Sequence, residues 1–274
     1  MPVPLSIVVP AYNEAVRLAQ SLPVILDYVN RTIPAAELIV VDDGSDDDTV
    51  EVAKRAFAAA TNINARVITY ESNRGKGYAV RCGLLACQAP IALFSDADLS
   101  SPITEAPKLV KPIEQGEYDL TFGSRALDRR LIGVHQPWRR EQGGRVFNLI
   151  VRLATGLPFW DTQCGFKAFR MSACRPIIEA ATIDRFGFDV ELLYVAHLAG
   201  LRLKEFPVRW DHKVGLLDTS GLYARDSLRM LSEVKKIRRQ VDKGVYSEAI
   251  SAARTMSLVE QKQQHISVAP DSHR

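Results

Sequence analysis

Two aspartates separated by one residue, Asp96 and Asp98, follow an apolar run at residues 91–94. Residues two apart on an extended chain point to the same side, so both carboxylates are predicted to converge at the end of a buried strand. Hard divalent cations prefer such oxygens and can at the same time hold a diphosphate, the group that a nucleotide-sugar carries. An isolated pair of this kind is more often a turn or capping feature, so the assignment depends on the rest of the chain.

Polar residues also follow two other predicted strands. Pro10, Tyr12 and Glu14 come after residues 5–9, and Asp42 and Asp43 come after residues 38–41. The first turn exposes backbone N–H groups, and the second pair can accept hydrogen bonds from ribose hydroxyls or a base N–H. The alternatives are an ordinary turn and helix start for the first group and a helix N-cap cluster for the second.

A short basic, glycine-rich segment, Arg74-Gly75-Lys76-Gly77, opens a predicted helix at residues 76–86. Small residues there would let the backbone approach a phosphate, which the helix N-terminus and the two cations favour. The spacing is not that of a Walker loop, and no GxGxxG follows a strand, so kinase-like and dinucleotide-dependent functions are weakly supported.

Basic residues gather in the second half of the chain. They lie in Gly123-Ser124-Arg125, Trp138-Arg139-Arg140 and His212-Lys213. Guanidinium groups match phosphate oxygens bidentately, so this set suits a second anionic group besides a donor diphosphate. For any single arginine, a solvated basic surface is the competing interpretation.

Two acidic positions in the second half have both functional and structural interpretations. Asp161 lies in the stretch 161–167 and could orient a sugar or an acceptor group, or could be a structural carboxylate paired with Arg170 or Lys167. Asp189 fits a helix N-cap, with Glu191 in the first turn.

The elements that must position these residues alternate between strand and helix. Strands are predicted at 5–9, 38–41, 65–70 and 91–94, and helices at 14–29, 48–60 and 76–86. This alternation predicts parallel βαβ units, which bind ligands beyond the carboxyl ends of their strands, where all the first-half motifs lie. The second half is less regular, with strands predicted at 118–123 and 203–208, helices at 145–153, 190–198 and 222–241, and a strand or turn region at 161–169.

The composition fits one catalytic domain. The 274 residues are 47% hydrophobic with a net charge of +3, and no aromatic-basic platform is visible, so nucleic-acid binding has little support. Four cysteines without CxxC spacing suggest reduced thiols and a cytoplasmic enzyme. No run of about 18 apolar residues is present, so we expect a protein that is soluble or lies peripherally on a membrane.

Taken in order, these motifs resemble those of family 2 glycosyltransferases with the GT-A fold. Within that family the chain looks most like the polyprenyl-phosphate sugar synthases, specifically the dolichyl-phosphate β-glucosyltransferase branch. The first-half motifs are specific for the superfamily only. The branch-specific segments are Gln136-Pro137-Trp138-Arg139-Arg140, Arg145-Val146-Phe147-Asn148, Asp161-Thr162-Gln163-Cys164-Gly165-Phe166-Lys167 and Phe188-Asp189-Val190-Glu191-Leu192-Leu193.

The resemblance covers about residues 5–240 and implies an α/β GT-A fold, a mostly parallel Rossmann-like sheet flanked by helices. We expect one glycosyltransferase domain at residues 1–246, with a nucleotide-sugar-binding half at 1–115 and an acceptor half at 116–221. Residues 247–274 are polar and are expected to form a disordered tail.

The resemblance also implies roles for individual residues. The nucleotide-sugar site is expected to comprise Pro10, Ala11, Tyr12, Glu14, Asp42, Asp43, Lys76, Asp96, Ala97 and Asp98. The acceptor phosphate is expected to bind Arg125, Arg139, Arg140, Gln163 and Lys213. Asp96 and Asp98 would hold Mg²⁺ or Mn²⁺, and the catalytic set would be Asp98, Asp161 and Arg125.

The expected reaction is a metal-dependent, inverting transfer of glucose from UDP-glucose to a polyprenyl phosphate. Because a phosphate monoester is largely dianionic at neutral pH, Asp161 is predicted to orient the acceptor or sugar rather than to act as an essential base. The alternatives are a GDP-mannose-dependent transferase, a family 2 transferase with a hydroxyl acceptor, and a non-catalytic nucleotide-sugar-binding protein.

A lipid acceptor requires a membrane surface or a membrane-protein partner. Residues 222–241 offer a candidate, because Leu231, Val234 and Val241 could form an apolar stripe on a basic helix in the headgroup region. The alternative is an ordinary helix packed on the catalytic domain. The accompanying basic residues are Arg225, Arg229, Lys235, Lys236, Arg238 and Arg239.

Overall fold

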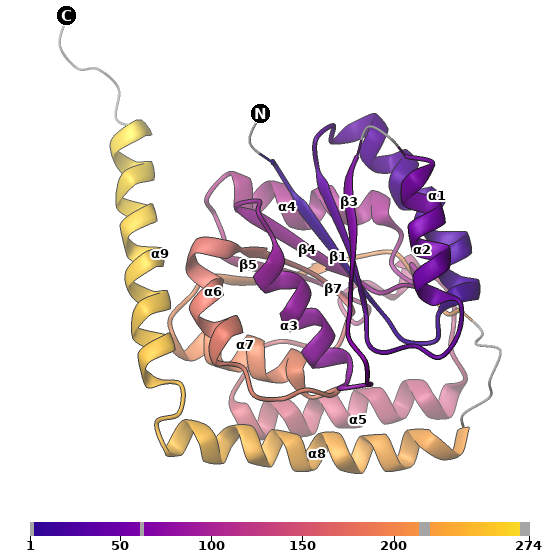
Figure 1. The fold of residues 1–274 in the computed structure, drawn as a ribbon. Coiled ribbons are helices and arrows are strands. Elements are labelled where there is room, and N and C mark those ends of the chain that lie inside the picture. Colours follow the sequence, from indigo (N-terminus) through magenta and orange to yellow (C-terminus); the bar gives the residue numbers. More distant parts are fainter. Residues whose placement is uncertain (1–2, 61–62, 214–219, 269–274) are drawn as a thin grey trace, which may run out of the picture.

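A computed structural model describes residues 3–60, 63–213 and 220–268. Its central feature is a sheet of seven strands in the order β3-β2-β1-β4-β7-β5-β8 (Figure 1). The strands are β1 (Ser6–Ala11), β2 (Glu37–Asp42), β3 (Asn64–Thr69), β4 (Ile91–Ser95), β5 (Leu120–Ser124), β7 (Phe166–Arg170) and β8 (Leu203–Pro207). The four first-half strands lie within two residues of their predicted positions, which confirms the expected α/β architecture.

The sheet is parallel except for β7, which runs antiparallel to both β4 and β5. A separate two-stranded sheet pairs β6 (Ile132–Val134) with β9 (Trp210–Asp211). The chain runs from β1 outward to β2 and β3, then returns through a helix to β4 on the other side of β1. Such a reversal leaves a crevice at the carboxyl ends of β1 and β4, where ligands bind in open α/β sheets.

Both faces of the sheet are covered by helices, so its central strands are apolar on both sides. Side chains alternate along β1: Ile7 and Val9 pack with Leu18 of α1, whereas Val8 packs with Val80 of α3. One layer comprises α1 (Ala15–Thr32), α2 (Thr49–Ala58) and α4 (Ala106–Glu114). The other comprises α3 (Lys76–Ala86), α5 (Trp138–Thr155), α6 (Met171–Ala180), α7 (Phe188–Leu198), α8 (Ser220–Asp242) and α9 (Ser247–Val268). Short 3₁₀ turns are present at Ile103–Glu105 and Arg129–Leu131.

The expected disordered tail is wrong for residues 247–268, because they form α9, which packs against α6 (Figure 1). Ala249 and Ala253 are buried one turn apart, and small side chains there let the two helices approach closely. Buried Ser257 donates a hydrogen bond to Asp119 at 2.9 Å, which fixes the helix to the end of the sheet. Residues 269–274 of the expected tail lie outside the described part of the chain.

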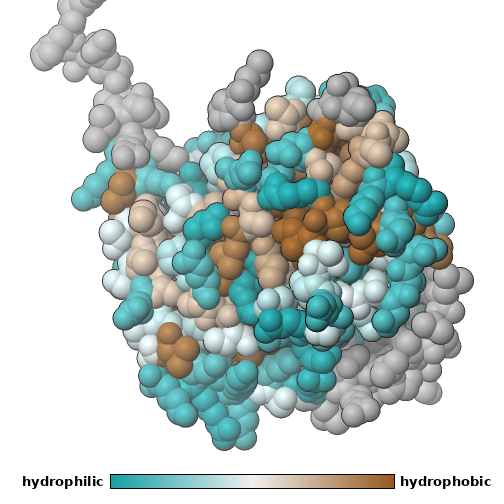
Figure 2. Space-filling view, viewed as in Figure 1, coloured by the Kyte–Doolittle hydropathy of each residue, from teal (hydrophilic) through white to brown (hydrophobic). Residues whose placement is uncertain are grey.

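The apolar stripe expected on the helix at residues 222–241 faces the domain. In α8, Val234 and Ile237 are buried, and Leu231 and Val241 pack against the same core. This arrangement favours the alternative of a helix packed on the catalytic domain; the side chains of residues 220–228 lie outside the described set. The outer side of the C-terminal half of α8 is mainly hydrophilic, at the lower left of Figure 2. Across the described residues, none of the helices combines the length and apolar character needed to cross a bilayer.

Candidate active site

The pair Asp96 and Asp98 lies in a turn directly after β4, not on an extended strand as expected. The backbone N–H of Leu99 donates to the carbonyl of Asp96 at 3.2 Å, and Leu99 has a positive φ of 49°. Asp98 accepts hydrogen bonds from the backbone N–H of Ser100 at 2.8 Å and from its hydroxyl at 2.9 Å. The turn and Ser100 therefore fix the direction of the Asp98 carboxylate, where sequence reasoning relied on strand alternation.

Asp96 is held between the two halves of the chain. Its backbone N–H donates to the carbonyl of Gly165 at 3.0 Å, and a Cβ at Gly165 would lie 1.9 Å from Asp96 Oδ2. The ammonium of Lys76, at the start of α3, lies 2.6 Å from Asp96 Oδ1. Burial lowers the pKa of Lys76, but Asp96, Asp189 and Asp98 together raise it above the ordinary value. The Asp96 carboxylate is thus already paired with the ammonium of Lys76.

A third carboxylate, Glu14, lies near this pair. Burial raises the pKa of Glu14 against the opposing effect of Arg17 at 2.5 Å, and the charges of Asp98 and Asp96 raise it further. Asp96 and Asp98 fit a hard divalent cation by donor type. Because the described residues contain no group of three or more His, Cys, Asp or Glu side chains that could hold a metal ion, ligand oxygens and water would have to complete the coordination.

The loops after β1 and β2 are tied together by hydrogen bonds. The N–H of Asn13 donates to Ser45 Oγ at 2.9 Å, and the N–H of Glu14 donates to Thr49 Oγ1 at 2.9 Å. Asn13 has a φ of 53°, a conformation that asparagine tolerates. Pro10 and Ala11 are buried beneath this turn and Tyr12 is exposed above it. The predicted β1 residues therefore reach the same sheet edge as Asp96 and Asp98.

The two aspartates after β2 have different surroundings, and neither caps α2. Asp43 accepts four hydrogen bonds of 2.7–3.0 Å, from Tyr70, Asn73, Arg74 N–H and Gly75 N–H. These bonds occupy about as many acceptor positions as a carboxylate offers, so Asp43 organises the loop before α3. Its contact with a nucleoside stays a prediction.

Asp42 accepts from Thr69 Oγ1 at 3.0 Å and more weakly from Ser45 N–H, which leaves it acceptor capacity. The N–H of Thr49, at the start of α2, donates instead to Asp47 at 3.0 Å. The N-cap alternative is therefore wrong for Asp42 and Asp43, whereas a nucleoside-binding role for Asp42 stays a prediction.

The glycines before and within α3 have a packing role, and their expected approach to a phosphate stays a prediction. A Cβ at Gly75 would lie 2.4 Å from the carbonyl of Asp184, and one at Gly77 would lie 2.5 Å from the carbonyl of Ile183. Both positions exclude side chains because the 183–185 segment packs against the helix start. From this motif, Lys76 is the residue that reaches Asp96.

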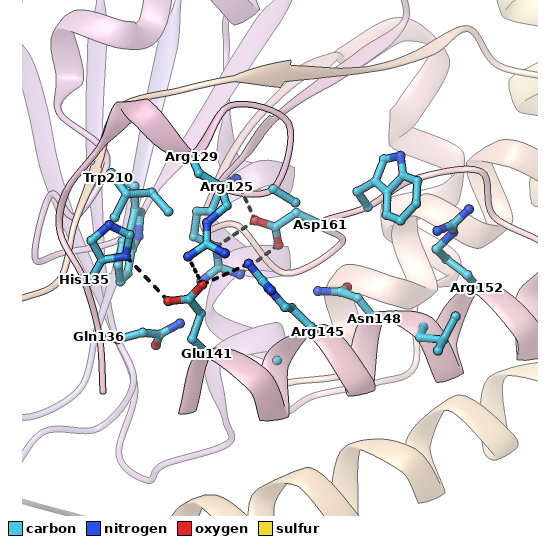
Figure 3. Close-up of a pocket in the computed structure, with 15 residues that line it drawn as sticks. Arg125, Arg129, His135, Gln136, Glu141, Arg145, Asn148, Arg152, Asp161 and Trp210 are labelled. Carbon is cyan, nitrogen blue, oxygen red and sulfur yellow. Dashed lines mark hydrogen bonds and ion pairs between the residues drawn. The ribbon is translucent and has the colours of Figure 1, made fainter. Parts of the chain in front are cut away.

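A cavity of about 430 Å³ lies beside α5, within the size range of small-molecule sites (Figure 3). Basic and aromatic residues dominate its wall. It is lined by Arg125, Ala126, Arg129, Ile132, His135, Gln136, Glu141, Gly144, Arg145, Asn148, Leu149, Arg152, Trp160, Asp161 and Trp210. Four arginines against two carboxylates make this wall net positive.

Asp161 and Arg125 form a bidentate ion pair in the cavity wall (Figure 3). Arg125 donates from Nε at 2.7 Å, from a terminal nitrogen at 2.8 Å and from its backbone N–H at 2.9 Å. Burial raises the pKa of Asp161, but Arg125 and then Lys167 outweigh it, so the net shift is downward. The expected pairings of Asp161 with Arg170 or Lys167 are therefore wrong, and a carboxylate this firmly ionised is a weak proton acceptor.

Two of the other cavity arginines gather around Glu141. Arg129 pairs with its carboxylate, Arg145 lies 3.2 Å from it and His135 lies 3.5 Å from it. Glu141 thus holds several cations around one wall of the cavity (Figure 3). None of these was named as a site residue from sequence; Arg145 lies in a branch-specific motif, which was the available signal.

Of the remaining predicted acceptor residues, the described side chains of Arg140, Gln163 and Lys213 do not line the cavity. The Gln163 amide lies 3.0 Å from the sulfur of Met230, and Lys213 is exposed. Burial and then Arg140 lower the pKa of His212, and Asp98 opposes this. The Arg139 side chain lies outside the described set. Acceptor roles for these residues stay predictions.

The carboxylate pair and the cavity are electrostatically connected. Burial lowers the pKa of Arg125, but Asp161 and, more weakly, Asp96 raise it to a net upward shift. Asp189 is buried in the first turn of α7, with Gly187 as the N-cap, and lies 2.6 Å from buried Lys167. Asp189 also raises the pKa of Lys76, so charges of alternating sign extend from the turn with Asp96 and Asp98 to the cavity.

Comparisons with known proteins bear on the family and the fold of the chain. The family model described as glycosyl transferase family 2 matches residues 6–178. The chain is 30% identical to the dolichyl-phosphate beta-glucosyltransferase of Dictyostelium discoideum, covering 88% of this chain and 76% of that protein. It is 35% identical to the human enzyme of the same name, covering 77% and 68%. It is 34% identical to the glycosyltransferase AglD of Haloferax volcanii over 85% of this chain, but spans only 36% of that longer protein.

A solved structure has the same fold. The glucosyl-3-phosphoglycerate synthase of Mycobacterium tuberculosis, in complex with Mn²⁺, UDP-glucose and glycerol 3-phosphate, aligns with a TM-score of 0.61. The alignment covers 85% of this chain and 80% of that one at 23% identity. This likeness concerns the fold and confirms the expected GT-A architecture.

Proposed function

The chain belongs to glycosyl transferase family 2, and from this premise we propose that it transfers glucose from UDP-glucose to the phosphate of a polyprenyl lipid. Mg²⁺ or Mn²⁺ would assist at Asp96 and Asp98, and the product would be a β-linked glucosyl phosphate lipid. The donor assignment draws on the relatives whose names specify dolichyl-phosphate glucosylation.

The observation that carries the proposal is the cavity beside the carboxylate pair. A phosphate monoester with an apolar tail requires cations for its head and apolar surface for its first isoprenyl units. The cavity offers both, with Arg129, Arg145 and Arg152 among its cationic residues and Leu149 and Trp160 among its apolar ones. Guanidinium groups bind phosphate oxygens in pairs, which supports a phosphate rather than a neutral hydroxyl acceptor.

The acceptor chemistry fits the ionisation of Asp161. A phosphate monoester loses its second proton with a pKa of about 6, so it is already a nucleophile at neutral pH. It attacks the anomeric carbon in line with the departing diphosphate, and one displacement turns an α-linked donor into a β-linked product. In this mechanism Asp161 orients Arg125, and Arg125 orients the acceptor phosphate.

Charge on the departing nucleoside diphosphate must be neutralised. Asp96 and Asp98 would hold the divalent cation, which supplies electrostatic stabilisation of the diphosphate when bound. Lys76 lies 2.6 Å from Asp96, so its ammonium would supply a second positive charge beside the diphosphate. Ser100 keeps Asp98 directed through two hydrogen bonds.

A transfer assay with purified protein tests the proposal. Sugar-labelled UDP-glucose and GDP-mannose are each incubated with Mn²⁺ and a polyprenyl phosphate, and label entering the organic phase is counted. We expect label from UDP-glucose and its loss on Asp98→Ala. A matched control is Asp27→Ala, which removes an exposed aspartate on α1 and should transfer label normally.

The other outcomes select among the alternatives. Label that moves only from GDP-mannose corrects the donor and keeps the acceptor chemistry. Transfer to a soluble hydroxyl acceptor, without lipid product, refutes the phosphate acceptor. Binding of UDP-glucose without its consumption under any of these conditions refutes enzymatic transfer.

A further inference from the structure

Helix α5 has two apolar sides, and only one of them is packed. Phe147 and Val151 are buried against the core. Val146 is 58% exposed, Ile150 is 38% exposed and Leu153 is 78% exposed. Their spacing of three and four residues places them on one side of the helix, together with the half-exposed cavity residue Leu149. An exposed apolar side of this size indicates a binding surface.

The neighbouring helix α8 presents the complementary charge. It packs beside α5 (Figure 1), with Val234 turned inward. Its exposed side chains in the described part are strongly basic. They include Arg229, Lys235, Lys236, Arg238 and Arg239. An apolar stripe and a basic stripe therefore lie on adjacent helices.

The cavity lies against α5, the helix that carries the exposed apolar side. Arg145, Leu149 and Arg152 belong to both α5 and the cavity wall, and Arg152 lies 3.9 Å above the ring of the half-exposed Trp160. Tryptophan is favoured where an apolar phase meets a wet one. An acceptor whose tail stays in a bilayer can deliver its phosphate to the cavity only if α5 lies at that bilayer.

We propose that α5 and α8 form one docking surface for an anionic lipid bilayer, with Val146, Ile150 and Leu153 inserted among the headgroups and the lysines and arginines of α8 on lipid phosphates. The proposal rests on the proposed function, since it names the phase from which the acceptor comes. The charge of α8 favours a bilayer over a protein partner, because the exposed side chains in its described part include five basic residues and only one carboxylate, Asp242. Two signals, apolar insertion and a basic cluster, are what stable attachment requires.

Vesicle flotation of the full chain, without donor or acceptor, tests the surface. The vesicles are phosphatidylcholine with or without phosphatidylglycerol. The double variant Val146→Glu with Leu153→Glu should lower binding at least tenfold, whereas Val24→Glu with Leu258→Glu, on exposed apolar residues of α1 and α9, should not.

The charge of α8 is tested in the same assay. Replacing Lys235 and Arg239 by alanine should lower binding to anionic vesicles about 25-fold, at about fivefold per charge, and leave binding to neutral vesicles unchanged. The matched control is alanine at Lys54 and Arg55 on α2, which should bind like the wild type.

Transfer to a short, water-soluble isoprenyl phosphate separates this proposal from the proposed function. We expect the glutamate double variant to keep wild-type transfer to this acceptor while losing vesicle binding. Equal vesicle binding by the wild type and both test variants would overturn the docking surface, as would a wild type that binds no vesicle; either leaves the transfer chemistry intact. Normal, variant-sensitive vesicle binding without any transfer to the soluble phosphate would support the surface and refute the function.

Discussion

Replacing Asp161 by asparagine tests whether this carboxylate orients Arg125 or acts as a base. The asparagine oxygen can keep one hydrogen bond from Arg125, but its amide nitrogen then faces the second donor that the structure places at 2.7–2.8 Å. One charge-assisted bond is lost, which amounts to about 1.5–3 kcal/mol. If that energy orients Arg125 toward the acceptor, we expect kcat/KM for the acceptor to fall roughly 10- to 150-fold.

The assay is initial-rate transfer with varied acceptor at several pH values. We expect the loss mainly in the acceptor KM, and a pH profile of the same shape, because no proton passes through Asp161. Asp128→Asn is a matched control: it removes the same kind of bidentate pair, with Arg130 at 2.8 Å, from an exposed position, and should leave kinetics unchanged. Thermal unfolding and UDP binding of each variant verify that the fold and donor site persist.

A different result would refute the reasoning. Removal of a general base typically costs 10²–10⁴-fold in rate and removes the acidic limb of the pH profile. A fall in kcat of that size, with unchanged acceptor KM and a flattened acidic limb, would mean that Asp161 accepts a proton. The acceptor would then be a hydroxyl group.

Three further outcomes are expected. Lys76→Met should tighten the binding of Mn²⁺ alone and weaken the binding of UDP-glucose, because Asp96 loses the ammonium at 2.6 Å. Calorimetry measures both affinities, and tighter UDP-glucose binding would contradict this expectation. The midpoint of thermal unfolding should fall as the pH drops below about 4. Burial raises the pKa of Asp119, but Arg202 outweighs it, so the net shift is downward. The stabilisation by the ionised carboxylate is therefore full above the unfolded pKa of about 3.9 and is lost in acid. Asp119→Asn should flatten that fall, and an unchanged slope would refute it. Removing residues 247–274 should lower the midpoint of thermal unfolding, because the loss of buried Ala253 and Ser257 exposes the side of α6 that α9 covers. An unchanged midpoint would show that α9 adds no stability.

The first half of the fold and the position of its motifs follow from local sequence. Strands β1, β2 and β4 contain continuous apolar runs at residues 7–11, 38–41 and 91–94, which is what burial on both faces requires, and a polar residue follows each run. Parallel strands bring those ends to one edge, so Glu14, Asp42 and Asp96 could be grouped without a structure.

The second half could not be predicted to the same depth because its key contacts join distant segments. Arg125 meets Asp161 across 36 residues, and the choice of Arg125 over Lys167 as the partner depends on how β5 and the 161–167 loop pack. The stripe on α8 had the right period, but periodicity does not say whether an apolar side faces protein or lipid. For α9, alanine and serine at the buried positions give a weak apolar signal, so a well-packed helix has the composition of a tail.

The contact between Gly165 and Asp96 sets a rule for building hybrid enzymes. A methyl group at residue 165 would overlap the Asp96 carboxylate, with a separation of 1.9 Å. A chimera that joins residues 1–115 of one family member to the following half of another therefore needs glycine here if the Asp96 carboxylate is to keep its place. Under the proposed function, the cavity wall can be changed to accept another acceptor, provided that the contact between residues 96 and 165 is kept.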